Sequence, residues 1–240
     1  MKNLKIIVLL SVLFLNIECA SKSSILVKDN VYTLSFADMT FSTSAEVGGR
    51  IVSFKSNGKE ILTTDSTHKT YYGGSFWVSP QSHYWPQDAN VDKLPYTPEV
   101  KGKTLRLTSQ TDNARICISK EFSVSEKDTA ILMNFSVKNI SSQSMKLAPW
   151  DVARVYGGLS FFPVGEKDEM NESDVVGAYE ENGFVWYPFP DQRFEKGQKL
   201  YSTGKGGWLA HYYQGLLFVK CFPDIKPSEV PPIQGEVEIF

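Results

Sequence analysis

The chain has 240 residues, a formal net charge of −2 and 42% hydrophobic residues. A chain of this length and apolar content can bury the core of one large all-β domain or of two small ones. No basic block stands out in the sequence, so we do not expect nucleic acid as a partner. Aromatic residues make up 13% of the chain, and they suit both a β core and the apolar faces of sugar rings.

The N-terminus has the pattern of a targeting segment. Two lysines precede an apolar run from Ile6 to Leu15, which is typical of a secretory signal peptide and too short to span a bilayer comfortably. We expect residues 1–20 to be a signal peptide and the mature protein to be exported to the periplasm or cell envelope. One alternative is cleavage near Ala20. The other is a lipoprotein signal, in which a lipidated Cys19 anchors the protein to a membrane, although Glu18 departs from the usual small residue.

The remaining chain consists largely of segments typical of β-strands. Many alternate apolar with polar side chains, as a strand with one buried face does. No segment sustains an apolar period of 3.6 residues for three turns, which excludes a doubly wound α/β fold. We predict one all-β domain over residues 25–240. The expected strands are residues 31–36, 50–54, 104–109, 115–124, 130–139, 145–155, 184–189, 207–213, 215–222 and 236–240. A tight hairpin is expected at Asn57-Gly58, which tolerate the positive φ angles of such a turn.

The segment GGSFWVSPQSHYWP, residues 73–86, is too apolar for a solvated loop, and its glycines and prolines disfavour a helix. It leads into a long excursion from the sheet, Ser79 to Pro98. Long excursions of compact domains are often functional. We therefore expect it to form a wall of a sugar-sized cleft. The residues predicted to reach the sugar are Trp77, Gln81, His83 and Trp85.

A second candidate group is the strand segment APWDVARV. In a strand, Trp150 and Arg154 share one face, and Asp151 projects from the other. Tryptophan can stack on a pyranose ring, and a guanidinium can donate hydrogen bonds to hydroxyls. The alternative is an arginine that extends over a core tryptophan. Arg50, which follows two glycines at the start of a strand, is a further predicted sugar contact.

Other chemistry-bearing residues have weaker patterns. His68 lies in a polar run, where we expect it to be exposed, and His211 is expected to be a hydrogen-bonded sheet histidine.

Cys117 and Cys221 could form one disulfide in an oxidising compartment or remain two buried free thiols. Neither cysteine has metal-ligand spacing to a histidine, so we expect no metal and no cofactor. The acidic segment Val164–Val176 is predicted to be a solvated loop rather than a calcium site.

Several motifs occur together in one order: GGRIVSF with NGKEIL, YYGGSFWVSPQSHYWP, the Ile-Cys-Ile strand, and NISSQSMKLAPWDVARV with GGLSFFP. Over roughly residues 28–240 they resemble the galactose-mutarotase-like (aldose 1-epimerase-like) superfamily, and in particular a branch of uncharacterised secreted bacterial proteins. The resemblance implies an antiparallel β-supersandwich whose concave sheet binds a carbohydrate.

The best-known enzymes of that superfamily use a histidine as the acid and a late glutamate as the base. The resemblance assigns the acid's strand to the segment with Trp150, which has no histidine. The base would follow the strand GEVEIF, where the chain stops at Phe240. Two alternatives stay open: a domain truncated at its C-terminus, with the base beyond Phe240, or a complete domain that lacks the usual base. We therefore predict an exported protein that binds a mono- or oligosaccharide, without assigned catalysis. The alternative is an aldose 1-epimerase-type enzyme, with His83 and a carboxylate as its acid–base pair.

Overall fold

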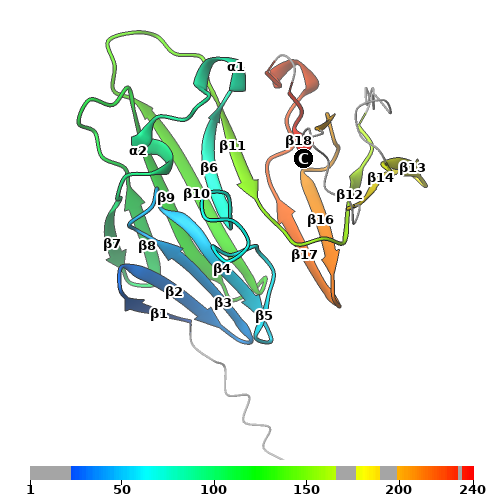
Figure 1. The fold of residues 1–240 in the computed structure, drawn as a ribbon, viewed down its shortest axis with the longest axis horizontal. Coiled ribbons are helices and arrows are strands. Elements are labelled where there is room, and N and C mark those ends of the chain that lie inside the picture. Colours follow the sequence, from blue (N-terminus) through cyan, green and yellow to red (C-terminus); the bar gives the residue numbers. More distant parts are fainter. Residues whose placement is uncertain (1–22, 166–176, 190–198, 232–233) are drawn as a thin grey trace, which may run out of the picture.

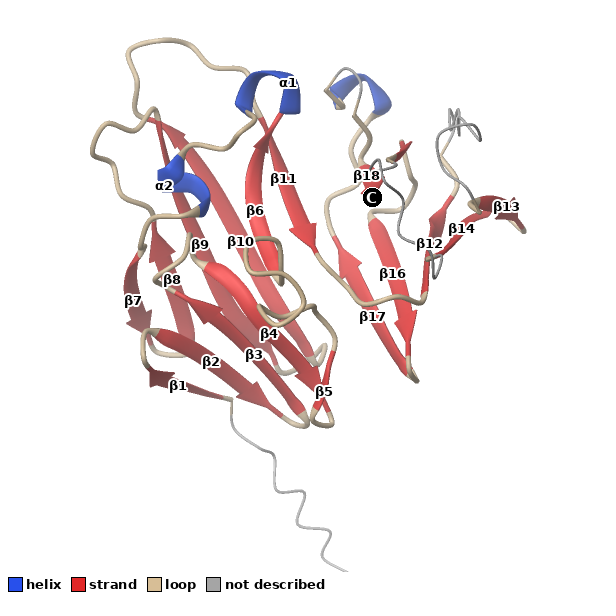
Figure 2. Ribbon diagram, in the orientation of Figure 1, coloured by secondary structure: helices blue, strands red, loops and turns tan. Residues whose placement is uncertain are grey.

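The computed structural model describes residues 23–165, 177–189, 199–231 and 234–240 (Figure 1). Strands make up 52% and helices 6% of these residues, and the strands pair antiparallel (Figure 2). The prediction of an all-β chain with antiparallel sheets is therefore confirmed. Within the described ranges, no helix has the length and apolar character needed to cross a membrane. The predicted signal peptide at residues 1–20 lies outside these ranges.

The first part of the chain forms two sheets that face each other. One has the order β1-β2-β3-β4-β6-β11, with β5 paired to β4, and the other has the order β10-β9-β8-β7. The bounds are β1 Ser24–Lys28, β2 Val31–Phe36, β3 Met39–Ser44, β4 Arg50–Ser56, β5 Lys59–Glu60, β6 Gly74–Ser79, β7 Thr97–Lys101, β8 Thr104–Thr108, β9 Ile116–Ser125, β10 Ala130–Asn139 and β11 Ala148–Ala153. Aromatic rings join the sheets, because Phe41 of β3 packs against Phe122 of β9, with ring centroids 5.3 Å apart. Phe76 of β6 packs against Phe135 of β10 at 4.6 Å.

The predicted hairpin at Asn57-Gly58 is confirmed. These two residues connect β4 to β5, and their φ angles are 50° and 73°. Positive φ at both positions is what a two-residue turn between twisted strands requires, and asparagine and glycine adopt it most readily.

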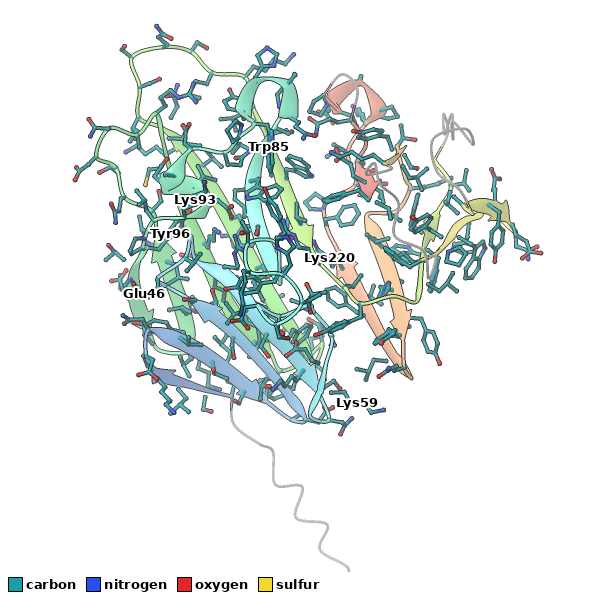
Figure 3. All side chains as sticks on the ribbon, viewed as in Figure 1. Glu46, Lys59, Trp85, Lys93, Tyr96 and Lys220 are labelled. Atoms are coloured by element: carbon teal, nitrogen blue, oxygen red, sulfur yellow. The ribbon has the colours of Figure 1, made fainter. Side chains whose placement is uncertain are left out.

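The second part of the chain forms a sheet of order β13-β14-β12-β16-β17 and a pair of strands, β15 and β18. Their bounds are β12 Leu159–Pro163, β13 Tyr179–Glu181, β14 Phe184–Pro188, β15 Leu200–Ser202, β16 Trp208–Tyr213, β17 Leu216–Cys221 and β18 Val237–Ile239, with a short 3-10 helix at Pro227–Glu229. A second core lies here, and it includes Phe162, Val185 and Val237. β17 contacts the first part directly, because Lys220 (labelled in Figure 3) forms an ion pair with Asp151 of β11 at 2.8 Å.

The excursion after β6 differs from its prediction in one respect. Two helical turns form within it, α1 at Gln81–Tyr84 and α2 at Ala89–Asp92, although its prolines and glycines were expected to prevent a helix. Both turns are only four residues long, and Pro80 precedes α1 as its N-cap, a place where the missing N–H costs nothing. Proline therefore limits the helices here without excluding them.

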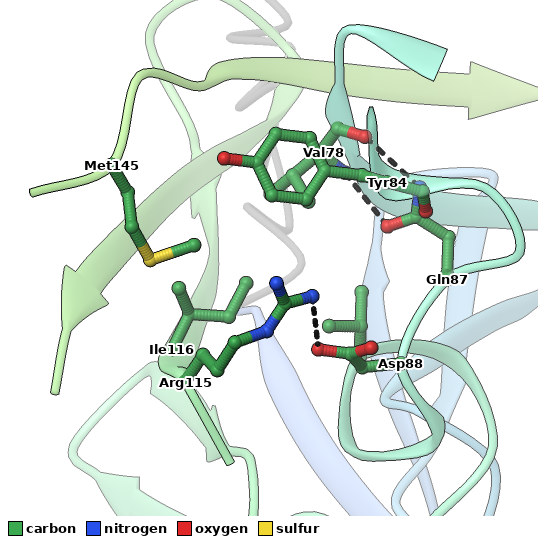
Figure 4. Close-up of a pocket in the computed structure, with 8 residues that line it drawn as sticks. Val78, Tyr84, Gln87, Asp88, Arg115, Ile116 and Met145 are labelled. Carbon is green, nitrogen blue, oxygen red and sulfur yellow. Dashed lines mark hydrogen bonds and ion pairs between the residues drawn. The ribbon is translucent and has the colours of Figure 1, made fainter. Parts of the chain in front are cut away.

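The side chain of Gln87 attaches this excursion to the sheet (Figure 4). Its Oε1 accepts a hydrogen bond from the backbone N–H of Val78 at 3.0 Å, and its Nε2 donates to the carbonyl oxygens of Val78 and Tyr84, both at 2.9 Å. The amide thus satisfies both backbone groups of Val78, as a neighbouring strand would. This contact fixes the excursion against β6, which carries one of the predicted site residues.

Candidate functional site

Two tryptophans project from the same face of β6 and β11. Phe76 packs into the core against Phe135, so Trp77, the next residue, projects from the opposite face, because side chains alternate along a strand. Trp150 lies directly opposite Trp77 in the antiparallel register, and the ring centroids are 5.2 Å apart. We call this face, which points away from the core between the two sheets, the outer face.

A third tryptophan reaches the outer face from the excursion. Trp85 ends α1 (Figure 3), and its ring centroid is 5.1 Å from that of Trp77 and 6.4 Å from that of Trp150. Trp77 and Trp150 are 3% and 8% exposed, whereas Trp85 is 42% exposed. These three residues form the tryptophan cluster. The sequence predicted all three as sugar contacts, and the structure brings them together with one ring accessible to solvent.

Arg154 lies at one end of the tryptophan cluster. Its guanidinium carbon is 5.0 Å from the ring centroid of Trp77 and 5.8 Å from that of Tyr71. Nη1 donates a hydrogen bond to Ser75 Oγ at 3.2 Å. Burial, with the nearby charge of Arg50, lowers the Arg154 pKa to about 10. The predicted arrangement of this strand is confirmed, because Arg154 shares a face with Trp77 and Trp150, whereas Asp151 pairs with Lys220 on the other side.

Arg50 is held inside the protein. Its Nη2 lies 3.1 Å from Asp92 Oδ1 at the end of α2, and Nη1 donates to the carbonyl oxygen of Thr70. The guanidinium also packs over the ring of Tyr72, at 4.9 Å, and the residue is 3% exposed. These contacts connect the segment before β6 to the excursion. They give no support to the predicted direct contact between Arg50 and a sugar.

A lysine–glutamate pair lies at the other end of the tryptophan cluster. Lys199 Nζ is 5.0 Å from the ring centroid of Trp150 and donates to Gln81 Oε1 at 2.7 Å. It lies 4.0 Å from Glu238 Oε2 in β18. The predicted sugar contact Gln81 therefore positions Lys199 in this structure.

Glu238 is the most enclosed carboxyl group at the site. Its side chain is 7% exposed, Oε1 accepts a hydrogen bond from Gln234, and Oε2 is buried without a hydrogen-bond donor in the part of the chain that the structure describes. Burial raises its pKa, and burial also lowers the pKa of Lys199. Sequence reasoning missed both residues. The one signal, for Glu238 alone, was the alternation of Val237 and Ile239, which directs Glu238 away from the core side of β18.

His83 does not join the tryptophan cluster through any contact of the described residues. It is exposed in α1, and its Nδ1 lies 3.0 Å from Ser82 Oγ. No carboxylate of the described chain forms an ion pair with it. Among the described residues, the structure therefore shows no carboxylate partner for His83 in its predicted role as the acid.

The other two histidines have structural contacts. His211 is buried, and its Nδ1 lies 2.9 Å from Ser160 Oγ on the neighbouring strand β12, as expected for a hydrogen-bonded sheet histidine. His68 is exposed, as predicted, and its Nδ1 accepts hydrogen bonds from the backbone N–H groups of Thr70 and Tyr71, at 3.0 and 2.9 Å. His68 thus shapes the segment that places Tyr71 beside Arg154.

Both described cysteines, Cys117 and Cys221, are free thiols, so the alternative without a disulfide is confirmed. Neither is buried, however, as that alternative supposed: Cys117 is partly exposed, and Cys221 is exposed on the outward side of β17. The described residues contain no group of ligand side chains arranged for a metal ion. Most of the acidic segment Val164–Val176 lies outside them.

Two hollows lie elsewhere in the molecule. One is a small hollow, open to solvent, beneath the excursion; Figure 4 shows its lining, with Arg115 and Asp88 paired at 3.1 Å. The other, also small and open, lies between β5 and the sheet that contains His211 and Phe218. Neither is lined by a residue of the tryptophan cluster. The tryptophan cluster presents an aromatic face with one exposed ring, and the sugar-sized cleft stays a prediction.

Comparison with known proteins adds no further constraint. No protein-family model matches the chain, and no curated protein is significantly similar to it. The resemblance to the galactose-mutarotase-like superfamily therefore stays a prediction from sequence motifs. What the geometry establishes is an all-β protein with three clustered tryptophans between an arginine and a lysine–glutamate pair.

Proposed function

We propose that this protein is an exported carbohydrate-binding protein, and that it binds a mono- or oligosaccharide at the tryptophan cluster of the outer face. The observation that carries the proposal is the convergence of Trp77, Trp85 and Trp150 from β6, the excursion and β11. The sequence resemblance to the galactose-mutarotase-like superfamily supports the same ligand class. Export, with or without lipidation of Cys19, rests on the N-terminal sequence.

The physical chemistry of the face suits a sugar ring. The half-exposed ring of Trp85 offers an apolar surface to the C–H groups of a pyranose, and the buried rings of Trp77 and Trp150 support it from below. Arg154 and Lys199 provide hydrogen-bond donors on either side. A dissociation constant of about 1 mM corresponds to about 4 kcal/mol. Because a stacked aromatic contact contributes only about 1 kcal/mol, a monosaccharide is expected to bind no more tightly than about 1 mM. A longer saccharide that contacts both ends binds more tightly.

Replacement of Trp85 by alanine is expected to weaken carbohydrate binding about fivefold, because the exposed stacking surface, which contributes about 1 kcal/mol, is lost. The melting temperature should change little, since Trp85 is 42% exposed. Isothermal titration calorimetry with the saccharide retained most strongly in a glycan screen measures the effect. The matched control is Tyr212→Ala, which removes another exposed aromatic ring from β16, 49% exposed. Equal binding by wild type and Trp85→Ala would contradict this placement of the site.

A second candidate function is an aldose 1-epimerase-type enzyme. The observation that favours it is the enclosed pair of Lys199 and Glu238 beside Trp150. Ring opening requires one group that gives a proton and one that takes it, and burial shifts the pKa values of both groups toward neutrality. His83, exposed and without a carboxylate partner among the described residues, is the weaker candidate for such a role.

Polarimetry separates the two functions. We expect this 240-residue chain to leave the mutarotation rate of common aldoses at the rate of the buffer. Acceleration that is lost in Glu238→Gln would establish the enzyme and assign its proton transfer to the lysine–glutamate pair. Acceleration that is lost in His83→Ala but kept in Glu238→Gln would restore the role predicted for His83.

A further inference from the structure

Positive charge is in excess behind the tryptophan cluster. Asp92 is the ion-pair partner of Arg50, at 3.1 Å, and its charge also acts on Arg154. The other carboxylate nearby, Asp151, forms its own ion pair with Lys220. Arg50 and Arg154 thus depend mainly on one carboxylate, Asp92, which already forms an ion pair with Arg50.

Arg154 is the cation of this group that faces solvent. It is only partly buried, and Nη1 donates to the neutral hydroxyl of Ser75. In the described chain, no carboxylate lies within 4 Å of its guanidinium nitrogens. Its remaining N–H groups are not sealed from solvent. A guanidinium without a carboxylate can bind an incoming anion through two parallel hydrogen bonds.

The indole of Trp77 provides a second, independent observation. Its ring lies under the Arg154 guanidinium, at 5.0 Å, and Trp77 is 3% exposed. Its Nε1 is buried, and no acceptor among the described residues hydrogen-bonds to it. A buried indole N–H normally donates to a hydrogen-bond acceptor. The Nε1–H of Trp77 has no such acceptor among the described residues, and an anionic ligand could supply one.

We infer that Arg154 and Trp77 form an anion subsite on the outer face, and that the carbohydrate recognised there is acidic and bears a carboxylate or sulfate group. The inference rests on the proposed function and specifies its substrate class. The acidic group pairs with the guanidinium of Arg154, while the sugar ring lies against the tryptophan cluster.

The opposite end of the cluster gives the ligand a direction. Glu238 Oε2 has no hydrogen-bond donor among the described residues and lies 4.0 Å from Lys199 Nζ. A carboxylate oxygen accepts hydrogen bonds from hydroxyl groups and repels a second carboxylate. The Arg154 guanidinium carbon is 5.0 Å from the ring of Trp77, Lys199 Nζ is 5.0 Å from the ring of Trp150, and the two ring centroids are 5.2 Å apart. An acidic disaccharide is long enough to place its acidic group at Arg154 and its hydroxyls toward Glu238.

A paired glycan panel tests this inference. It contains uronic-acid and sulfated oligosaccharides, each beside the neutral oligosaccharide with the same backbone and linkage. Wild-type protein should retain acidic members about tenfold more strongly than their neutral partners, and this preference should fall as NaCl concentration rises. Retention of the uronates alone would show that the protein recognises a carboxylate, and retention of the sulfated members alone would show that it recognises a sulfate.

Variants connect the preference to the subsite. Arg154→Gln should lose the preference for acidic members, and Arg154→Lys should keep part of it. The matched control Arg106→Gln removes an exposed arginine that pairs with Glu121 on the other sheet and should bind like wild type. Circular dichroism checks that each variant folds. If Arg154→Gln does not fold, the binding preference of Arg154→Lys tests the subsite instead.

The outcomes distinguish this inference from the proposed function. If acidic and neutral partners are retained equally and Trp85→Ala weakens both, the anion subsite is wrong and the carbohydrate site stands. An acidic preference that survives in Arg154→Gln also overturns the subsite. If wild-type protein retains no member of the panel, the carbohydrate-binding function itself is contradicted.

Discussion

The free energy of unfolding of this protein is expected to rise between pH 7 and about pH 9, because of one lysine in the core. Lys120 projects from β9 into the space between the first two sheets and is 2% exposed. Its Nζ donates to the carbonyl oxygen of Gly48 at 2.6 Å and lies 5.0 Å from the ring centroid of Tyr96. Burial lowers its pKa from the ordinary 10.5 to about 7.

The sign of the effect follows from the two pKa values. Below about pH 7, Lys120 is protonated in both states, so the full cost of burying the ammonium weakens the fold. Between pH 7 and the unfolded value near 10.5, the folded protein has released the proton while the unfolded chain still holds it. Stability therefore rises through this window, by at most about 1.4 kcal/mol per pH unit. Burial raises the pKa of Tyr96, which opposes the rise above about pH 10.

Urea unfolding at pH 6, 7, 8 and 9 measures this slope. The Lys120→Met variant keeps a side chain of similar length without the titrating group, so its curve should lose most of the rise between pH 7 and 9. The matched control is Lys138→Met, which removes an exposed lysine from the adjacent strand β10 and should keep the wild-type slope. A wild-type curve that is flat or falling from pH 7 to 9, or a slope that persists in Lys120→Met, would contradict the assignment.

Gly73→Ala is expected to destabilise the fold by about 3 kcal/mol or more and to abolish carbohydrate binding. Gly73 has a φ of +61°, and a Cβ there would lie 2.0 Å from the carbonyl oxygen of Ile51. The left-handed conformation costs alanine about 1–2 kcal/mol, and the collision forces β4 and β6 apart at an additional cost of about 1–3 kcal/mol. The carbonyl of Gly73 also accepts the backbone N–H of Arg154 at 2.9 Å, so the anion subsite moves with it.

Gly58→Ala provides the control for this prediction. Gly58 also has a positive φ, +73°, but a Cβ there would meet no atom within 4 Å. It should therefore show only the conformational cost, about 1–2 kcal/mol, with unchanged carbohydrate binding. Urea denaturation and calorimetric titration measure both variants. Equal stability losses for the two substitutions would show that the contact with Ile51 is not what makes glycine necessary at position 73.

The pattern of neighbouring residues in the sequence determined many of the strands and turns of this protein. The alternation of apolar and polar residues predicted strands such as β2, β9 and β10, because a strand that buries one face must alternate. Asn57-Gly58 predicted a hairpin, because only a few residues accept its backbone angles. The same alternation placed Trp150 of β11 and Arg154, just beyond its end, on one face, and aromatic enrichment indicated Trp77 and Trp85.

Tertiary structure alone decided how these residues are used. Arg50 and Arg154 look alike in sequence, but the ion pair with Asp92, 42 residues away, holds Arg50 in the interior and leaves Arg154 without a carboxylate. Lys199 and Glu238 formed no motif, because the contacts that join them to Trp150 span distant parts of the chain. Local pattern determines which face a side chain takes, since that depends on neighbouring backbone angles. Packing between distant segments decides which charges remain without an opposite charge. Because it leaves Arg154 without a carboxylate, we expect the outer face to prefer an acidic sugar.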